Sequence, residues 1–336
     1  MRGFNIWVTR ECNLKCEYCY EGHTKSRVSI SHDKVESVIC FILENSSQEK
    51  EIVVNFHGGE PLLEIDTIER ICIGLIATIK CTFSLTTNGT IVTEKIIRLL
   101  KKYAFNVSIS IDGKKISHDT NRKYQDGTGS FERVFSTAQL LKENKINLRA
   151  RMTVTPNNYM LLKENVIFLL ENGFNEIVAM PDLYANNWTD DKLKLIEKQL
   201  ISLYAVNDDD SFVFFDDLCR KSICYGGKQE CNIDSDLNIY PCTMCVGIST
   251  MNIGNVEMGI NQNILKQWNE MNNEELTSCS GCTYLDRCIA NRCKIINFLL
   301  EGGSGNASPL VCGFTNIVKN ALKYKKLLMK GEKYEN

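Results

Sequence analysis

Cys12-Asn13-Leu14-Lys15-Cys16-Glu17-Tyr18-Cys19-Tyr20 is the stretch from which the organisation of this chain can be worked out. It directly follows residues 4–9, an apolar run that predicts a buried strand. The three cysteines are therefore expected on a loop at the carboxyl end of a strand, where β/α folds carry their chemistry. Three thiolates on one short loop suit an iron–sulfur cluster or zinc. A cuboidal cluster takes four ligands, so one of its irons would remain open.

Length and composition describe a globular protein that is rich in cysteine. The chain has 336 residues, of which 43% are hydrophobic and 24% are charged, as in ordinary globular domains. A net charge of −2 gives no indication of a nucleic-acid partner. The sequence shows neither a signal peptide nor an apolar run of ~18 residues, which predicts a cytoplasmic protein without a membrane span. In that reducing compartment, sixteen cysteines are expected to bind metal rather than to form disulfides.

Strand and helix patterns alternate through the first two-thirds of the chain. Further strands are predicted at 52–56, 82–87, 106–111, 148–154 and 176–180. Helices are predicted between them, at 33–43, 65–79, 94–103, 131–143 and 159–171. Such alternation predicts an α/β fold with a parallel sheet and right-handed crossovers. The pattern by itself fits a partial barrel and an open doubly wound sheet equally well.

The cysteine loop resembles that of the radical S-adenosylmethionine (radical SAM) enzymes. Zinc sites favour CxxC pairs answered by a second pair or by histidines, and CxxxCxxC followed by an aromatic residue fits them poorly. The resemblance implies that Cys12, Cys16 and Cys19 hold a 4Fe–4S cluster whose open iron is chelated by SAM. It also implies a partial (β/α)6 TIM-like barrel, and an electron donor such as flavodoxin or ferredoxin.

Loops after the later strands resemble the SAM-binding segments of the same family. His57-Gly58-Gly59-Glu60-Pro61 follows the second strand, and the resemblance implies that Gly58, Gly59 and Glu60 hold the ammonium group of SAM. The other implied SAM contacts are Tyr20 near the adenine, Asn88 after the third strand, Ser110 on the fourth strand, and Arg122. Arg133 and Arg149 compete with Arg122 for this role.

Ten of the cysteines lie between residues 219 and 312, where zinc alone would fit about as well. Their spacing resembles the SPASM domain, a C-terminal extension of radical SAM enzymes that binds two auxiliary 4Fe–4S clusters. The resemblance assigns Cys224, Cys242 and Cys293 to the first auxiliary cluster. It assigns Cys279, Cys282, Cys288 and Cys312 to the second. The first cluster then has either a fourth ligand or an open iron where substrate could bind. Cys231 and Cys245 are both candidates for the fourth ligand; Cys231 is preferred, and Cys219 looks spare.

The chain departs from the SPASM pattern in two places, and the resemblance suggests three segments. The gap between Cys288 and Cys293 is one residue longer than usual. Leu237 occupies a hairpin position at which family members often have glycine. The predicted organisation is a radical SAM partial barrel at 1–210, a small, loop-rich SPASM-like iron–sulfur domain at 211–320, and a C-terminal helix and tail at 321–336.

The resemblance implies an enzyme that modifies a peptide or protein. It would cleave SAM reductively to a 5′-deoxyadenosyl radical, which removes a hydrogen atom from a ribosomal peptide and leads to a thioether or other crosslink. The alternative is anaerobic formylglycine formation on a sulfatase, which uses an aspartate base where this chain has Thr243. An uncharged hydroxyl cannot act as that base near neutral pH. A non-enzymatic zinc or electron-transfer scaffold is a third interpretation.

Overall fold

The computed structural model describes residues 1–21, 28–206, 211–215, 224, 226–273 and 276–329. These residues form two compact units, each assembled from separate stretches of the chain. Unit 1 comprises Met1–Ser110, Arg122–Leu148 and Tyr225–Met271, and unit 2 comprises Ile111–Asn121, Arg149–Cys224 and Asn272–Asn336. The predicted α/β class is confirmed, because both units combine parallel strands with helices. The domain boundaries predicted at residues 210 and 320 group the chain differently and stay a prediction.

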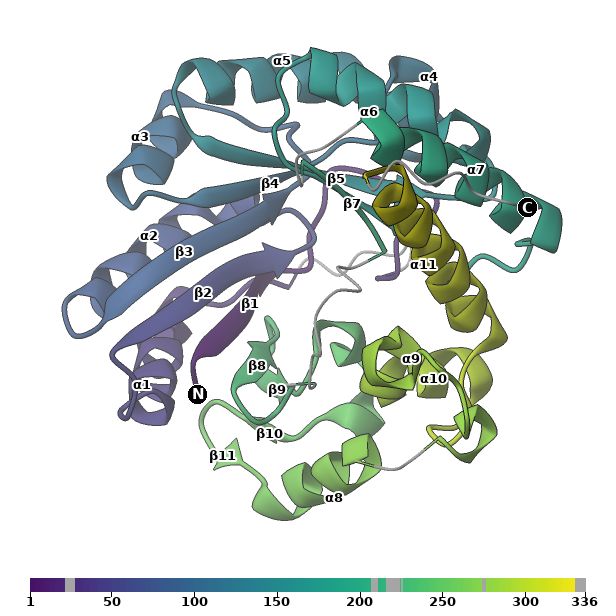
Figure 1. The fold of residues 1–336 in the computed structure, drawn as a ribbon. Helices are drawn as coiled ribbons and strands as arrows, with labels where there is room; N and C mark the ends of the chain where they lie inside the picture. The colour runs from purple at the N-terminus through teal and green to yellow at the C-terminus, as the bar shows by residue number, and fades with distance from the viewer. Residues whose placement is uncertain (22–27, 207–210, 216–223, 225, 274–275, 330–336) are drawn as a thin grey trace. The chain divides into compact units, whose positions relative to one another are not determined.

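Unit 1 is built on a sheet whose central strands are parallel. β1 (Gly3–Thr9), β2 (Glu51–Gly58), β3 (Lys80–Thr87) and β4 (Asn106–Ser110) are neighbours in chain order. β8 (Glu230–Ile233) pairs in parallel with the other side of β1. The antiparallel strands β9 (Asn238–Tyr240), β10 (Gly254–Asn255) and β11 (Gly259–Ile260) continue the sheet. Figure 1 shows the green strands β8 and β9 beside the purple β1.

The two faces of this sheet differ because apolar and polar residues alternate along its strands. One face carries the buried residues Phe4, Ile6, Val8, Ile52, Val54, Phe56, Phe83 and Leu85. Helices α1 (Val35–Asn45), α2 (Ile65–Ile76) and α3 (Glu94–Lys102) pack on this face, and α5 (Phe131–Glu143) adds Leu141 to the same core (Figure 1). On the opposite, polar face, Asn55 Nδ2 donates to Asn5 Oδ1 at 3.1 Å, and Ser84 Oγ donates to Asn55 Oδ1 at 3.0 Å.

The hairpin of β8 and β9 leads into Cys242, as the sequence predicts for residues 233–240. Asp234 Oδ1 accepts the backbone N–H groups of Asp236 at 2.9 Å and of Asn238 at 2.8 Å, which closes the turn. Leu237 has a φ of +67°, in the left-handed region that glycine adopts most readily. This backbone conformation explains why glycine is common at this position in the family that the sequence resembles.

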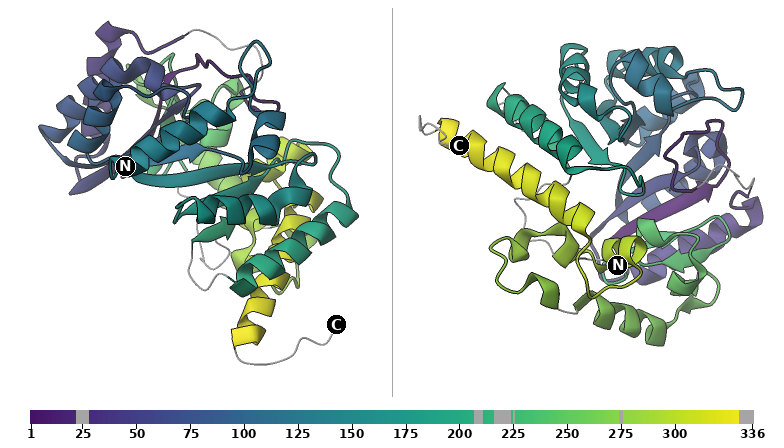
Figure 2. Two further views of the ribbon diagram at one scale, coloured as in Figure 1. Left: turned by 90° about the horizontal axis from the view of Figure 1, so that it is seen from above. Right: turned by 90° about the vertical axis from the view of Figure 1, so that its right-hand side faces the viewer.

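Unit 2 contains a shorter parallel sheet. Its strands are β5 (Asn147–Val154, which begins in unit 1), β6 (Ile177–Pro181) and β7 (Phe212–Phe214), paired in this order. Helices α4 (Lys115–Asn121), α6 (Leu162–Glu171) and α7 (Asp190–Val206) belong to the same unit. Helix α11 (Pro309–Met329) lies along α7 (Figure 2). A Cβ on Gly313 would stand 2.6 Å from Leu193 Cδ2, so the glycine lets the two helices approach closely.

The cysteine-rich region holds short helices, and its last helix begins earlier than expected. α8 (Gln262–Asn273), α9 (Ile289–Arg292) and α10 (Lys294–Glu301) precede α11. The sequence predicts the C-terminal helix and tail at 321–336, whereas α11 begins at Pro309 and includes Cys312. Proline is favoured in the first turn of a helix, because the backbone N–H that it lacks would have no partner there.

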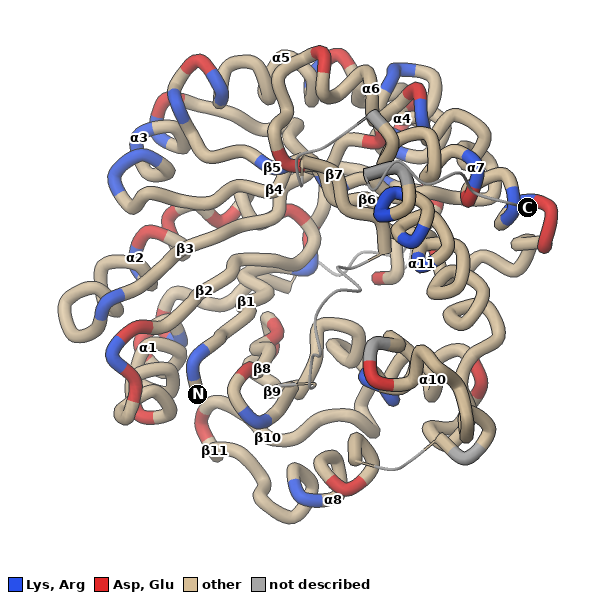
Figure 3. The backbone as a smooth tube through the Cα atoms, in the orientation of Figure 1, with Lys and Arg blue, Asp and Glu red and all other residues tan. Residues whose placement is uncertain are grey.

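The predicted strands of the first two-thirds are confirmed, as are the helices between them, with small shifts at their ends. Lysine and arginine residues are interspersed with acidic residues along the chain, in agreement with its small net charge (Figure 3). Across the part of the chain that the structure describes, no helix combines the length and the apolar character needed to cross a membrane.

Candidate functional site

The three N-terminal cysteines lie on the loop that follows β1. Leu14 anchors this loop with a side chain that is only 1% exposed, whereas the three thiols are partly buried. The backbone N–H of Leu14 donates to Cys12 Sγ at 3.5 Å. The N–H of Lys15 donates to the carbonyl of Lys123 at 2.7 Å, which fastens the loop to the chain after residue 121. The loop therefore has a fixed place at the carboxyl end of the sheet.

The Gly58-Gly59-Glu60 segment lies directly against the cysteine loop. Gly59 N–H donates to the Thr9 carbonyl at 2.9 Å, and Glu60 N–H donates to the Glu11 carbonyl at 2.8 Å. A Cβ on Gly58 would stand 2.2 Å from the Thr9 oxygen, and one on Gly59 would stand 2.2 Å from the Glu11 oxygen. Only glycine permits so close an approach of two backbones.

The Glu60 side chain is buried and joins β2 to the end of β3. Its carboxylate accepts hydrogen bonds from Thr87 Oγ1 at 2.7 Å, from the Asn88 N–H at 2.7 Å and from the Leu62 N–H at 3.1 Å. Burial raises the pKa of Glu60 from 4.5 to about 7, although these hydrogen bonds oppose the shift. Glu60 thus holds the backbone of two neighbouring loops, with its side chain occupied by protein contacts.

Asn88 connects the third strand to the cysteine loop. Its Nδ2 donates to Asn13 Oδ1 at 2.8 Å and lies 3.7 Å from Cys12 Sγ. Asn13 Nδ2 in turn donates to Thr90 Oγ1 at 2.8 Å, and the Thr90 N–H donates to Asn88 Oδ1 at 2.9 Å. The sequence predicts Asn88 as a site residue but overlooks Asn13. A polar amide directly after the first cysteine is the signal that would have found it.

Arg122 lies beside the cysteine loop. Its side chain is 7% exposed, and its guanidinium carbon is 5.1 Å from the centroid of the Tyr18 ring. The sequence does not predict Tyr18 as a site residue. It predicts Tyr20, which is 52% exposed and whose contact with adenine stays a prediction. Ser110 is the last residue of β4 and is partly buried.

Arg133 and Arg149, the two arginines that compete with Arg122, have different surroundings. Arg133 Nε donates to the Thr90 carbonyl at 2.9 Å, close to the Asn88 network. Arg149, in unit 2, pairs with Glu176 at 2.9 Å near the surface. Arg122 and Arg133 are therefore near the cysteine loop within unit 1, whereas the Arg149 guanidinium is engaged elsewhere.

The donor set of the N-terminal loop fits an iron–sulfur cluster. Cluster thiolates accept N–H···S hydrogen bonds that stabilise their charge, and Cys12 has two such donors, from Leu14 and Asn88. Among the described residues, no three His, Cys, Asp or Glu side chains converge as they would around a single ion.

Four cysteines of unit 2 lie near one another. Burial raises the pKa of the Cys312 thiol, and three neighbouring thiols raise it further. These three are Cys288, Cys279 and Cys282. They are the residues that the sequence assigns to the second auxiliary cluster, and gathered thiolates repel one another unless metal binds them.

The two candidates for a fourth ligand of the first auxiliary cluster have different surroundings. Cys231 lies on β8 inside the hydrophobic core, where burial raises its pKa to about 12. Cys245 hydrogen-bonds to Cys242 through its thiol, which lowers the pKa of Cys242. The Cys245 N–H also donates to the Cys242 carbonyl at 3.0 Å. The preference for Cys231 over Cys245 as the fourth ligand stays a prediction.

The remaining predicted ligands are divided between the two units. Cys242 belongs to unit 1, whereas Cys224 and Cys293 belong to unit 2, and all three are partly buried. Their assignment to one cluster stays a prediction. Cys219, which the sequence leaves without a role, lies outside the described residues.

Comparison with known proteins shows what the chain is similar to. A model of the radical SAM superfamily matches residues 6–168. The chain is similar to the radical SAM cyclopropyl synthase TigE of Paramaledivibacter caminithermalis, with 27% identity over 63% of this chain and 48% of that protein. It is also similar to a cysteine-type anaerobic sulfatase-maturating enzyme of Clostridium novyi, with 26% identity over 84% of each chain. The chain thus spans about half the length of TigE.

A solved structure shares the fold over nearly the whole chain. Native anSMEcpe with bound AdoMet and Cp18Cys peptide aligns with a TM-score of 0.80 and 21% identity, covering 98% of both chains. At this level of identity the likeness concerns the fold, and it agrees with the mixed α/β architecture described above.

Proposed function

We propose that this chain, whose residues 6–168 match a model of the radical SAM superfamily, is a radical SAM enzyme that modifies a side chain of a peptide or protein. A domain of this family takes a 4Fe–4S cluster and SAM. The observation that carries the proposal is the hydrogen bonding of the Gly58-Gly59-Glu60 backbone to the chain just before Cys12. These hydrogen bonds hold the segment proposed to bind the amino-acid part of SAM against the loop proposed to bind the cluster.

The residues proposed to hold the cofactors lie at the ends of β1 to β4. Cys12, Cys16 and Cys19 would bind the cluster, and the segment Gly58–Glu60 would bind the SAM ammonium group. Arg122 would bind the SAM carboxylate, with Asn88 fixing the loop; Tyr20 and Ser110 are assigned further SAM contacts by resemblance. When bound, the cluster and SAM supply the radical that removes a hydrogen atom from substrate. The protein orients these groups and excludes water.

We also propose two auxiliary 4Fe–4S clusters, which would make three clusters per chain. Cys279, Cys282, Cys288 and Cys312 would bind one of them. Cys224, Cys242 and Cys293 would bind the other, with Cys245 in place of Cys231 as the fourth ligand. The contact between the Cys242 and Cys245 thiols supports this change, because Cys231 is enclosed by apolar side chains. Auxiliary clusters would accept an electron from the substrate or bind its thiolate.

The proposed substrate is a ribosomal precursor peptide, and the proposed product is a thioether or other crosslink. The similar structure of anSMEcpe holds a peptide, which supports a peptide substrate. Thr243 argues against sulfatase maturation, since a hydroxyl is a poor base at the position that follows Cys242. The enzyme is proposed to act in the cytoplasm, with flavodoxin or ferredoxin as its electron donor.

The test is anaerobic reconstitution with iron and sulfide, followed by reductant and SAM. We expect about twelve irons per chain, as three cuboidal clusters require, and 5′-deoxyadenosine that is lost in Cys16→Ala. With a cysteine-containing precursor peptide, a mass loss of two hydrogens is expected. An aldehyde on the peptide would identify formylglycine formation instead. If the protein binds zinc and forms no 5′-deoxyadenosine, it is the non-enzymatic scaffold and the proposed function is wrong.

A further inference from the structure

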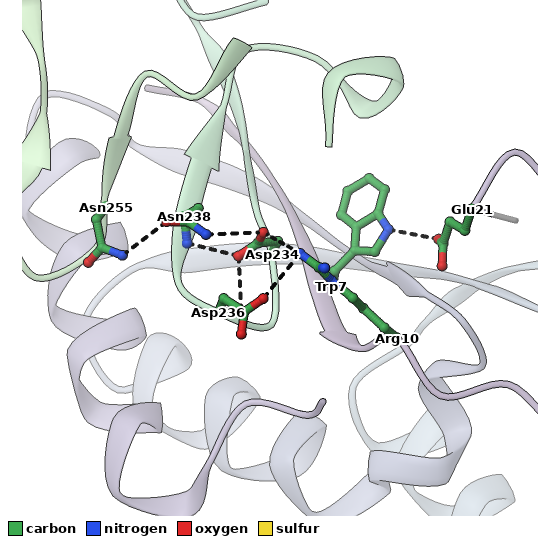
Figure 4. Close-up of polar contacts among 7 residues, drawn as sticks. All are labelled: Trp7, Arg10, Glu21, Asp234, Asp236, Asn238 and Asn255. Atoms are coloured by element: carbon green, nitrogen blue, oxygen red, sulfur yellow. Dashed lines mark hydrogen bonds and ion pairs between the residues drawn. The ribbon is translucent and has the colours of Figure 1, made fainter. Parts of the chain in front are cut away.

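An ion pair joins the cysteine loop to the hairpin before Cys242, and both partners belong to unit 1 (Figure 4). Arg10, two residues before Cys12, donates from Nη2 to Asp234 Oδ2 at 2.7 Å. The same nitrogen lies 3.2 Å from Asp236 Oδ2. Arg10 and Asp234 are 224 residues apart in the chain, so this contact exists only in the folded protein.

On the hairpin side, Arg10 neutralises a carboxylate that the turn depends on. The Asp234 side chain is fully buried. Its Oδ1 accepts the backbone N–H groups of Asp236 and Asn238, and Asn238 Nδ2 lies 3.5 Å from its Oδ2 (Figure 4). These contacts hold Leu237 in its left-handed conformation. A buried carboxylate of this kind depends on its cation, because an uncompensated charge is unfavourable away from water.

On the loop side, the backbone of Arg10 contacts the glycine segment Gly58–Glu60. Its N–H donates to the Val28 carbonyl at 2.9 Å. A Cβ added to Gly59 would stand 2.6 Å from the Arg10 carbonyl oxygen, so the two backbones are in close contact. A shift of Arg10 would therefore be transmitted to Gly59 and, through the chain, to Cys12.

We propose that Arg10 is a positioning residue that makes the geometry of the SAM-cluster loop depend on the hairpin ending at Cys242. The hairpin holds the guanidinium, and the guanidinium holds the backbone between β1 and the first cluster ligand. Loss of this contact would leave both elements folded but would misplace the cysteine loop relative to the glycine segment. The inference rests on the N-terminal cluster and SAM, and it does not depend on the identity of the peptide substrate.

The experiment compares SAM binding by reconstituted variants that lack one or both charges. The readout is the change that SAM causes in the electron paramagnetic resonance spectrum of the reduced N-terminal cluster, titrated with SAM alone. We expect Arg10→Gln to weaken SAM binding roughly 10- to 100-fold, as is typical when a group behind a metal ligand is lost. The double variant Arg10→Gln/Asp234→Asn has no buried unpaired charge but still lacks the contact, and it should bind SAM as weakly as Arg10→Gln. Recovery of the affinity in the double variant would show that the unpaired charge alone caused the loss, and it would overturn the inference.

A control tests whether another ion pair of unit 1 has the same effect. Lys34, just before α1, and Glu257, between β10 and β11, form an exposed pair outside the cysteine loop and the hairpin. Lys34→Gln should bind SAM as the wild type does. Arg10→Lys keeps the charge but lacks the planar, rigid arrangement of guanidinium donors, and it should fall between wild type and Arg10→Gln. If Arg10→Gln does not fold, the SAM affinity of Arg10→Lys tests the proposal in its place.

Unfolding of the metal-free proteins separates positioning from simple stability. If Arg10→Gln lowers the unfolding temperature while its SAM titration matches the wild type, Arg10 only stabilises the fold and the inference is wrong. Equal weakening by Lys34→Gln would also overturn it. If the wild type holds no cluster at all, the proposed function fails instead, which is a different result from an intact cluster that is indifferent to Arg10.

Discussion

The Glu60 carboxylate accepts the backbone N–H of Asn88 at 2.7 Å, and so ties the loop after β2 to the loop after β3. Asn88 Nδ2 also lies 3.7 Å from Cys12 Sγ. Asn88 therefore links the buried Glu60 carboxylate to Cys12, a proposed cluster ligand. The arrangement of the three loops therefore depends on a few polar contacts, and each can be tested separately.

The first prediction concerns stability against pH. Burial raises the pKa of Glu60 to about 7, so the folded chain retains a proton that the unfolded chain releases above about pH 4.5. Its contribution to stability is complete below about pH 4.5 and is lost as the pH rises through about 7, with an upper bound of about 3 kcal/mol. Denaturant unfolding of metal-free wild type and Glu60→Gln between about pH 5 and about pH 8 should show a difference that changes with pH. A constant difference would contradict the prediction, and Glu94→Gln is the exposed control.

A second prediction concerns the close approach at Gly59. In Gly59→Ala the new methyl group would meet the carbonyl oxygens of Glu11 and Arg10 at 2.2 and 2.6 Å. Because both atoms belong to the backbone, the segment must move, at about 1–3 kcal/mol of unfolding free energy. Calorimetric SAM titration should show weaker binding. Gly303→Ala has open space around its Cβ and should behave as the wild type. Wild-type SAM binding by Gly59→Ala would contradict the proposed role of the Gly58–Glu60 segment in binding SAM.

The third prediction concerns the hydrogen bond to the thiolate. Asn88→Ala removes the side-chain N–H that lies 3.7 Å from Cys12 Sγ. The N-terminal cluster should then lose iron to a chelator on the order of 10-fold faster, because groups behind metal ligands commonly contribute this much. Asn144→Ala removes an amide that accepts from Lys101 at 2.8 Å, away from the cysteines, and should retain iron normally. Equal iron loss from both variants would contradict a specific role for Asn88.

The fourth prediction separates two buried cysteines. Cys245→Ala should reduce reconstituted iron by about four atoms per chain, the content of one cuboidal cluster. Cys231→Ala should retain all its iron and instead lower the unfolding free energy by about 1 kcal/mol, since it removes an apolar contact from the core. Iron analysis and denaturant unfolding measure the two effects. The reverse result would restore Cys231 as the ligand.

The fifth prediction concerns the SAM carboxylate. Arg122→Met keeps much of the packing over Tyr18 but removes the guanidinium, and SAM binding should weaken roughly tenfold, equivalent to about 1.4 kcal/mol. Arg149→Met breaks only the surface pair with Glu176 and should leave the dissociation constant unchanged. Equilibrium titration with SAM measures both. A large loss of SAM affinity in Arg149→Met alone would show that Arg149, and not Arg122, binds the SAM carboxylate.

The parallel strands and their helices could be predicted because their signal is local. Residues 52–56 and 82–87 are short apolar or alternating runs bounded by turn residues, and both form strands close to the predicted ends. Leu237 was noticed as a departure from the family pattern, and its φ of +67° supplies the reason. The start of α11 lies earlier than predicted, at Pro309, which is a favoured first residue of a helix.

The sequence alone determined which cysteines lie together on the N-terminal loop and which strands carry the neighbouring segments, because spacing and periodicity are properties of adjacent residues. Only the tertiary structure decided the contacts between distant residues. It placed Asn13 against Asn88, Arg10 against Asp234 and Cys245 against Cys242, while it buried Cys231 in the core. The physical reason is that a side chain's surroundings depend on strand pairing and helix packing, and no residue-type pattern records which distant group will lie within hydrogen-bonding distance.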